Sequence, residues 1–391
     1  MTGRERLLAV LNGQMPDRVP VTLFLADQGH FITQIHPDLD PWDHEACQLK
    51  IVDFLRDMGC DVLLRCLYGI NDPLNIHTGG LFVHQQTADW EVHTEDVRDG
   101  QTLIKRSTIH TPDGTLTQDY SIFELRPGTF MYACTKKPIQ TEHDLDIAIQ
   151  HEPRMPADWP ARTRAKLARL KAAVGDDGIV ATWTPHGPFN NASLLIDLDR
   201  LYSLYLEDYP FYVKLMTFAM ERILDYARGM DDAGTDLHCV GGNVPGGFLG
   251  KKNYDTYVLP FERKYIEFVQ AQGTPAMYHN CGQVMNLVDS YKALSVRAVE
   301  PFSPVPLGDV TDLAAVKRTV NGAYVMLSGV DQVNILQQGT VDDVERATER
   351  AILAGKPRGG FILQSVDFLE YDTPLKNLEA FTRTGLKHAA Y

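Results

Sequence analysis

The chain has 391 residues, of which 44% are hydrophobic and 23% charged, a composition typical of a globular protein with a large core. Lys plus Arg number 37 and Asp plus Glu 51, so the net charge is −14, and repulsion disfavours nucleic acid and anionic membranes as partners. No apolar run approaches the roughly 20 residues of a membrane helix, and the start, MTGRERLLAVLNG, lacks the apolar core of a secretory signal. We therefore expect a cytoplasmic protein whose six cysteines are reduced thiols.

The first predicted element is a short helix at residues 3–12, because Thr2 and Glu5 have the spacing of a capping box and Gly13 follows its end. From Val19 on, short apolar runs alternate with loops and with stretches whose apolar residues recur every three or four positions. The apolar runs predict eight strands, at 19–25, 61–67, 178–184, 235–241, 275–280, 297–302, 323–329 and 359–365. Helices are predicted at 44–58, 210–229, 254–271, 341–354 and 374–388, among others.

Eight units of a strand followed by a helix predict an α/β fold, a (β/α)₈ TIM barrel whose active site lies at the C-terminal ends of its strands. We expect one domain over residues 1–391. Because the sequence does not show closure of the sheet, a doubly wound open sheet is the alternative.

Residues 80–140 interrupt this rhythm with runs in which polar and apolar residues alternate. Asp113-Gly114 between two such runs is a strong hairpin signal. We therefore predict an antiparallel β insertion after the second barrel strand. It carries the aromatic residues Trp90, Tyr120, Phe123, Phe130 and Tyr132. Packing within the insertion is the simpler role for them, and a lid over the barrel mouth is the alternative.

The stretch AMYHNCGQV, residues 276–284, places an imidazole and a thiol two residues apart at the end of the fifth predicted strand. Side chains two apart in a strand point to the same side, so His279 and Cys281 are expected to face the barrel mouth together. Gly282 then lets the chain turn into a helix beginning near Val284. Imidazole and thiolate are both good zinc ligands, although two residues alone do not define a metal site.

Further polar residues lie at predicted strand ends. Glu300 belongs to the sixth strand and Asp367 to the loop after the eighth, which would bring two carboxylates to the same mouth. Solvation or ion pairing is the ordinary role for such residues. Weaker substrate-contact candidates are Asp27, His30, Asn71, Asp72, His186, Asn190 and Asn243. Asp331 is better explained as the N-cap of the helix that follows it.

The sequence resembles the uroporphyrinogen decarboxylase superfamily, and within it the corrinoid-dependent methyltransferase branch. The resemblance extends nearly from end to end: RERLLAVLNGQMPDRVPV at the start, TPHGPF at 184–189, the HNCG core, GDVTDLAAVKRTVNGAYVMLSGVDQVNILQQGTVDDVE, and GGFIL followed by YDTPLKNLEAF. Decarboxylases of the superfamily bind their tetrapyrrole carboxylates with an Arg-Gln-Ala-Gly-Arg stretch. The corresponding segment here is FLADQGHF, and no arginine lies between Arg18 and Arg56, which disfavours decarboxylation.

The resemblance to the methyltransferases implies that His279 and Cys281 are zinc ligands. Their third ligand is a cysteine after the last strand, and this position falls on Asp367, so a carboxylate replaces a thiolate. Glu300 stands where some members have a fourth ligand in the absence of substrate. Glu300 and Asp367 are also the catalytic candidates. The corrinoid is expected on a separate protein, because the chain has no Asp-x-His-x-x-Gly stretch.

The function expected is zinc-dependent methyl transfer between a small substrate and a corrinoid protein. A carboxylate-containing ligand set favours oxygen over sulfur as the bound substrate atom, so we expect removal of methyl from a methoxy compound, such as an aromatic one. Three alternatives stay open: a methyltransferase that methylates a thiol, a decarboxylase, for which Arg65 is the only evident cation at the mouth, and a barrel that binds without catalysis. Whether the chain forms a homodimer is also left open.

Overall fold

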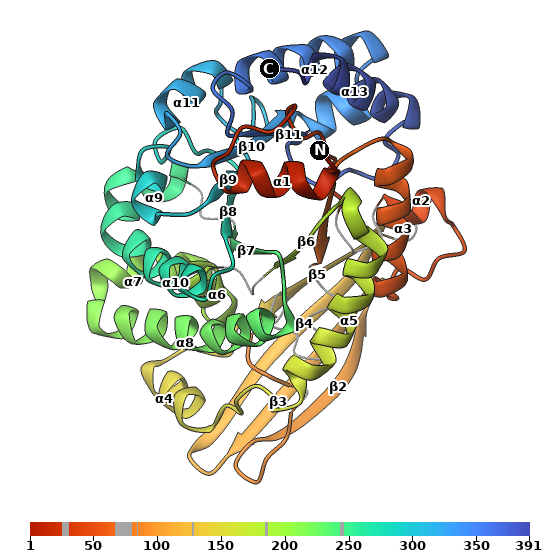
Figure 1. Cartoon of the computed structure of the whole chain (residues 1–391). Coiled ribbons are helices and arrows are strands. Elements are labelled where there is room, and N and C mark those ends of the chain that lie inside the picture. The colour runs from red at the N-terminus through yellow and green to blue at the C-terminus, as the bar shows by residue number, and fades with distance from the viewer. Residues whose placement is uncertain (26–30, 67–79, 84, 127–128, 184–186, 243–245) are drawn as a thin grey trace.

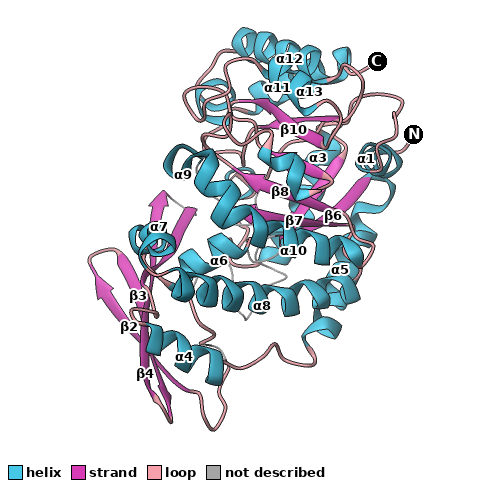
Figure 2. Cartoon of the chain, turned by 90° about the vertical axis from the view of Figure 1, so that its left-hand side faces the viewer, coloured by secondary structure: helices cyan, strands magenta, loops and turns pink. Residues whose placement is uncertain are grey.

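The computed structural model describes the chain apart from residues 26–30, 67–79, 84, 127–128, 184–186 and 243–245 (Figure 1). The side chains of 125, 126, 129, 130, 132 and 247 are also outside the description. The described residues form an α/β fold with two sheets, a curled parallel sheet surrounded by helices and a separate antiparallel sheet (Figures 1 and 2).

The parallel sheet has seven strands, and each begins and ends within two residues of a predicted strand. They are β1 (Val62–Cys66), β6 (Gly178–Trp183), β7 (Leu237–Gly242), β8 (Ala276–Asn280), β9 (Ala298–Glu300), β10 (Val325–Val330) and β11 (Phe361–Ser365). Each strand pairs with the next in this order. The alternation of strands and helices therefore predicted both the strand positions and their parallel direction.

The predicted strand at 19–25 forms an extended segment rather than a continuous strand. Its backbone contacts both edges of the sheet: Thr22 N donates to Leu363 O of β11 at 2.9 Å, and Asp61 N donates to Val21 O at 2.8 Å just before β1. Leu363 N also donates to Pro20 O. The segment thus joins the two edge strands by isolated hydrogen bonds. An eight-stranded closed barrel and a single domain stay predictions.

Each helix that was predicted by its residue range is present. The predicted capping box of Thr2 and Glu5 is present at α1 (Gly3–Leu11). The predicted helix at 254–271 is divided into one π-helical turn, Tyr254–Val258, and α10 (Leu259–Ala271). The others are α2 (Ile32–Ile35), α3 (His44–Asp57), α4 (Glu142–His151), α5 (Trp159–Val174), α6 (Pro188–Leu195), α7 (Leu198–Glu207), α8 (Tyr209–Ala233), α9 (Gly246–Asn253), α11 (Leu313–Val320), α12 (Val341–Gly355) and α13 (Leu375–His388). Among the described residues, no helix combines the length and the apolar character that a membrane span needs.

The predicted insertion is an antiparallel sheet in the order β2 (Glu91–Asp99), β3 (Thr102–Thr111), β4 (Gly114–Arg126) and β5 (Thr129–Lys136). The β3–β4 turn is Pro112-Asp113, one residue before the predicted Asp113-Gly114 pair, and Thr111 lies opposite Gly114, the first residue of β4. Trp90 is fully buried and donates from Nε1 to Phe82 O at 2.8 Å, which is a packing role. In Figure 2 this sheet lies on the side of the molecule away from α1.

Alternate residues of the parallel strands face two different cores. One set packs against the surrounding helices, and the other fills the interior of the curled sheet together with Leu7, Val10 and Leu11 of α1. Arg4 of α1 donates to Gly178 O at the start of β6, so α1 covers the N-terminal ends of the strands. The interior set includes Leu63, Ile179, Ala181, Leu237, Cys239, Met277, Ala298, Leu327 and Ile362. Two residues further along their strands, on the same side, come Arg65, His279, Glu300 and Gln364, which places these polar side chains above the apolar layer.

Candidate metal centre

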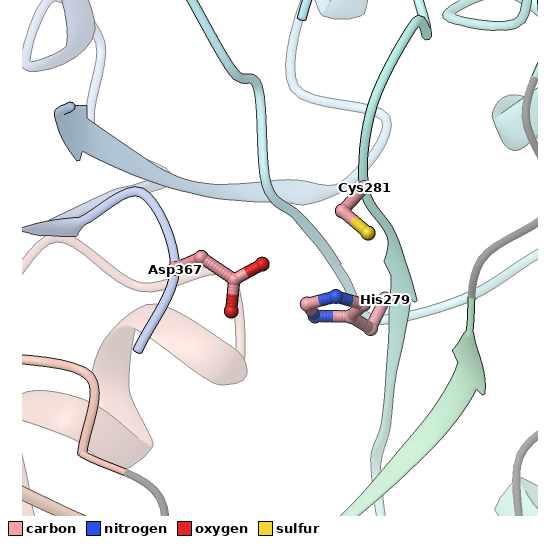
Figure 3. A group of neighbouring side chains, drawn as sticks. All are labelled: His279, Cys281 and Asp367. Atoms are coloured by element: carbon pink, nitrogen blue, oxygen red, sulfur yellow. The ribbon is translucent and has the colours of Figure 1, made fainter. Parts of the chain in front are cut away.

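Three side chains predicted as metal ligands converge at the C-terminal end of the parallel sheet. One ligand atom from each of His279, Cys281 and Asp367 lies within 4.8 Å of the other two. Figure 3 shows His279 and Cys281 projecting from the same stretch of chain, with Asp367 facing them from another loop. His279 is buried, and the other two are half-buried. The group therefore combines one nitrogen, one sulfur and one oxygen donor that a small ligand could approach.

The position of His279 and Cys281 follows from local backbone geometry. His279 lies in β8, and Cys281 follows the last strand residue with its side chain on the same side, as the two-residue spacing predicts. Gly282 has a φ of 89°, a conformation that favours glycine, and it turns the chain away. The prediction of a helix beginning near Val284 is wrong. Turns follow instead, and then a short 3₁₀ helix, Ser290–Leu294.

Asp367 enters the group from the loop after β11. Its Oδ1 accepts a hydrogen bond from the backbone N–H of Phe368 at 2.8 Å, which fixes one carboxylate oxygen. Burial raises the pKa of Asp367, and the His279 charge and the Phe368 bond only partly offset that effect. A positive charge at the site would therefore stabilise the ionised carboxylate.

Glu300 lies beside His279 but is not part of the group of three. Its Oε1 is 3.1 Å from His279 Nδ1, and its carboxylate forms a fully buried ion pair with Arg65, in which Nη2 is 2.7 Å from Oε2. Gln364 Nε2 also donates to Oε2 at 3.0 Å. Arg65, the cation considered for a decarboxylase, is thus paired with a carboxylate inside the sheet. The role of Glu300 as a fourth metal ligand stays a prediction.

The protein environment favours the ionised forms of both His279 and Glu300. Burial alone lowers the pKa of His279, but hydrogen bonds to Cys281 and Glu300 and the nearby carboxylate charges raise it to about 10. Burial alone raises the pKa of Glu300, but Arg65 and His279 lower it to about 2. The rings of Trp183 and Phe24 lie 5.1 and 6.2 Å from the His279 ring and exclude water from its sides.

The donor set suits a borderline metal ion such as zinc, which binds imidazole nitrogen, thiolate and carboxylate. A metal-binding histidine commonly donates its second ring N–H to a carboxylate, and Glu300 is placed to accept from Nδ1. These residues therefore fit a metal centre in which Nε2 of His279, Sγ of Cys281 and a carboxylate oxygen of Asp367 are the ligands.

The other predicted site residues have different outcomes. Asp27, His30, Asn71, Asp72, His186 and Asn243 lie outside the described residues. Asn190 is half-buried in α6. Asp331 is an N-cap, as predicted, since its Oδ1 accepts from Val333 N and Asn334 N. Gln364 and Trp183 were missed, because a glutamine or a tryptophan inside an apolar run carries no local sign that it will lie beside the site.

A cavity of about 900 Å³ lies elsewhere, between α11, α12 and the N-terminal ends of β10 and β11. It is lined by Arg297, Lys317, Arg318 and Arg358, among others, and includes none of the three converging residues. It is therefore separate from the candidate metal centre.

The class of protein follows from the parallel sheet, the converging donors at its C-terminal end, and a family comparison. The family model described as "Uroporphyrinogen decarboxylase (URO-D)" matches residues 146–387. The chain belongs to this family.

Individual relatives are methyltransferases, which confirms the resemblance to that branch. The chain is 24% identical over 360 residues to the methylcobamide:CoM methyltransferase MtbA of Methanosarcina mazei, covering 90% of each chain. It is 23% identical over 142 residues to the protein of the same name from Methanosarcina acetivorans, covering 36% of this chain and 40% of that one. A solved methyltransferase structure from Methanosarcina mazei superposes with a TM-score of 0.71 at 16% identity and 99% coverage of both chains, so the fold is shared along the whole length.

Proposed function

We propose that this protein is a corrinoid-dependent methyltransferase that removes a methyl group from a small methoxy compound, such as a methoxyaromatic, and delivers it to the cobalt of a separate corrinoid protein. The observation that carries the proposal is the convergence of His279, Cys281 and Asp367 in a chain related to methyltransferases over most of its length. The cytoplasm stays the predicted location.

In this proposal the three side chains bind one zinc ion, which, when bound, supplies a Lewis acid that polarises the substrate heteroatom. His279 of β8 and Cys281, which directly follows that strand, would anchor the ion from one side, and Asp367 would complete the set from the loop that faces them. The difficult methyl chemistry belongs to the corrinoid. The rings of Trp183 and Phe24, in T-shaped contact with the His279 ring, limit access of water to this part of the site.

The carboxylate of Asp367 supports oxygen as the substrate atom. A carboxylate is a harder ligand than a thiolate and donates less electron density. The metal therefore stays more Lewis acidic and favours oxygen donors. In the family pattern this position is a cysteine, and the exchange is the main departure of this chain from that pattern. An ether oxygen is accordingly the proposed point of contact.

A second candidate function is transfer in the opposite direction, from a methylcobamide to an acceptor such as a thiol. The name of the relative MtbA favours it, because that protein is a methylcobamide:CoM methyltransferase. The two candidates use the same metal centre and differ in the substrate that it activates.

One experiment separates them. The purified zinc-loaded protein is mixed with reduced cobalamin and a panel of methoxyaromatics, and formation of methylcobalamin is followed by its absorption spectrum. Methylcobalamin formation with at least one methoxy compound is expected. Loss of methyl from methylcobalamin only when a thiol is added would establish the second candidate instead. Release of carbon dioxide from uroporphyrinogen would contradict both.

A further inference from the structure

The polar side chains beneath His279 form one closed network. Arg65 donates from Nη1 and Nη2 to the two oxygens of Glu300, and from Nη2 to Oε1 of Gln364 at 2.8 Å. Gln364 completes the ring by donating from Nε2 to Glu300. All three side chains are at most 1% exposed. The ring of Phe24 covers the guanidinium of Arg65 at 3.8 Å, so the network cannot exchange partners with water without unpacking.

This network uses the full acceptor capacity of Glu300. Oε1 faces Arg65 Nη1 and His279 Nδ1, and Oε2 faces Arg65 Nη2 and Gln364 Nε2. A carboxylate has about four lone-pair sites, and each has a donor here. Coordination of a metal by Glu300 would therefore require loss of a charge-assisted hydrogen bond in a buried environment.

The network also has only one workable arrangement. If the Gln364 amide were flipped, its NH₂ group would face the guanidinium of Arg65 and its oxygen would face the carboxylate of Glu300. A donor would then face a donor, and an acceptor would face an acceptor. The amide orientation, the carboxylate plane and hence the side of Glu300 that meets His279 are determined together.

We propose that Arg65 and Gln364 are positioning residues, which fix Glu300 against Nδ1 of His279 and so orient the imidazole with Nε2 toward Cys281 and Asp367. The inference rests on the metal centre of the proposed function. It assigns Glu300 to His279 rather than to the metal, and it assigns a functional purpose to two residues that touch neither metal nor substrate.

The test measures metal affinity and the visible absorption of the cobalt(II)-substituted protein, neither of which requires methyl transfer. Glu300→Gln, Gln364→Met and Arg65→Met are each expected to weaken metal binding and shift the cobalt bands. Partners of metal-binding histidines typically contribute about 10- to 100-fold in affinity. Because Arg65 and Gln364 act through Glu300, Gln364→Met combined with Glu300→Gln should bind metal no more weakly than Glu300→Gln alone.

The matched control is Arg222→Met, which breaks another buried ion pair, Arg222 with Glu152 at 2.7 Å, both 4% exposed in their side chains. It should lower stability and leave the metal affinity and cobalt bands unchanged. If Arg65→Met fails to fold, the milder Gln364→Met carries the test.

Three outcomes would overturn the inference. If the loss of metal affinity in the double variant, Gln364→Met with Glu300→Gln, equals the product of the two single losses, Gln364 acts independently of Glu300. Tighter metal binding in Gln364→Met would show that the network restrains Glu300 from the metal. Unchanged cobalt spectra in all three single variants would show that the network does not position His279. Failure of the unaltered protein to bind zinc or cobalt would instead reject the proposed metal centre itself, and this inference with it.

Discussion

His279 of β8 and Glu300 of β9 are direct register partners in adjacent parallel strands, and Nδ1 of one lies 3.1 Å from Oε1 of the other. Because parallel strands end at the same edge, their last inward-facing residues form one layer. Arg65 and Gln364 contribute to this layer from β1 and β11. This layer lies between the apolar interior and the converging side chains of the candidate metal centre. The same residues therefore affect both the stability of the sheet and the geometry of that centre.

The buried pair of Arg65 and Glu300 predicts a large loss of stability when one member is removed. Glu300→Ala leaves a guanidinium buried without its carboxylate, and removal of one partner of such a pair costs about 3–5 kcal/mol. Urea denaturation of the metal-free protein would measure this. Replacement of both residues by apolar ones, Arg65→Met with Glu300→Leu, should recover most of the loss. A cost below about 1 kcal/mol for Glu300→Ala, as for a surface pair, would contradict the prediction.

Removal of the thiol ligand should abolish stoichiometric metal binding. Cys281→Ala is expected to yield a folded protein with far less than one zinc per chain, because the two cores do not depend on this half-buried side chain. Metal analysis after purification without chelator, together with circular dichroism, would check it. Cys134→Ala is the matched control, since Cys134 lies in β5 of the separate antiparallel sheet. Full zinc occupancy in Cys281→Ala would show that this thiol is not a ligand.

Exchange of the carboxylate for a thiolate should change substrate preference while zinc is retained. In Asp367→Cys, a sulfur donor replaces an oxygen donor, which makes the metal less Lewis acidic and better suited to thiols. We expect slower formation of methylcobalamin from methoxy compounds at unchanged zinc content, measured in the same assay. Asp367→Asn is the companion variant, because it retains the size of the side chain and removes its charge. Equal turnover by Asp367→Cys and the unaltered protein would place this residue outside the metal centre.

A second buried carboxylate, Glu262 of α10, predicts a pH dependence of stability. It is fully buried, and its Oε1 accepts from Phe189 N at 3.2 Å. Burial raises its pKa from 4.5 to about 8, and the hydrogen bond from Phe189 offsets this only in part. Because the pKa of Glu262 is higher in the folded state than in the unfolded state, protonated Glu262 contributes to the free energy of unfolding. This contribution is fully present below pH 4.5 and is lost as the pH rises toward 8, by up to about 1.4 kcal/mol per pH unit.

Glu262→Gln retains the shape of the side chain and removes this titration, so its free energy of unfolding should decline less between pH 5 and 8 than that of the unaltered protein. Urea denaturation at each pH unit would measure both slopes. Glu267→Gln, on a side chain of the same helix that is 57% exposed, serves as the control and should retain the steeper slope. Parallel slopes for the unaltered protein and Glu262→Gln would contradict the prediction.

The sequence by itself determined the features that depend on local backbone geometry. Alternation and helical periodicity placed seven parallel strands and the helices α1, α3, α8, α10, α12 and α13, and Asp113-Gly114 located the hairpin of the insertion. The shared direction of His279 and Cys281 belongs to the same class, because the two-residue period of a strand holds whatever lies around it. The segment at 19–25 was misjudged because an apolar run does not show whether its backbone will complete a ladder or only bridge two edge strands.

The tertiary structure alone decided which polar residues meet. Arg65 looked like a cation at the mouth, and it is the buried partner of Glu300, 235 residues away in the chain. Gln364, inside an apolar run, carried no sign that it would hold both of them. Such contacts arise from the register of strands that are distant in sequence, and from the high cost of leaving a charge unpaired once the sheet has enclosed it. For this reason the sequence could suggest candidate metal ligands, but the network beneath His279 became visible only in the folded chain.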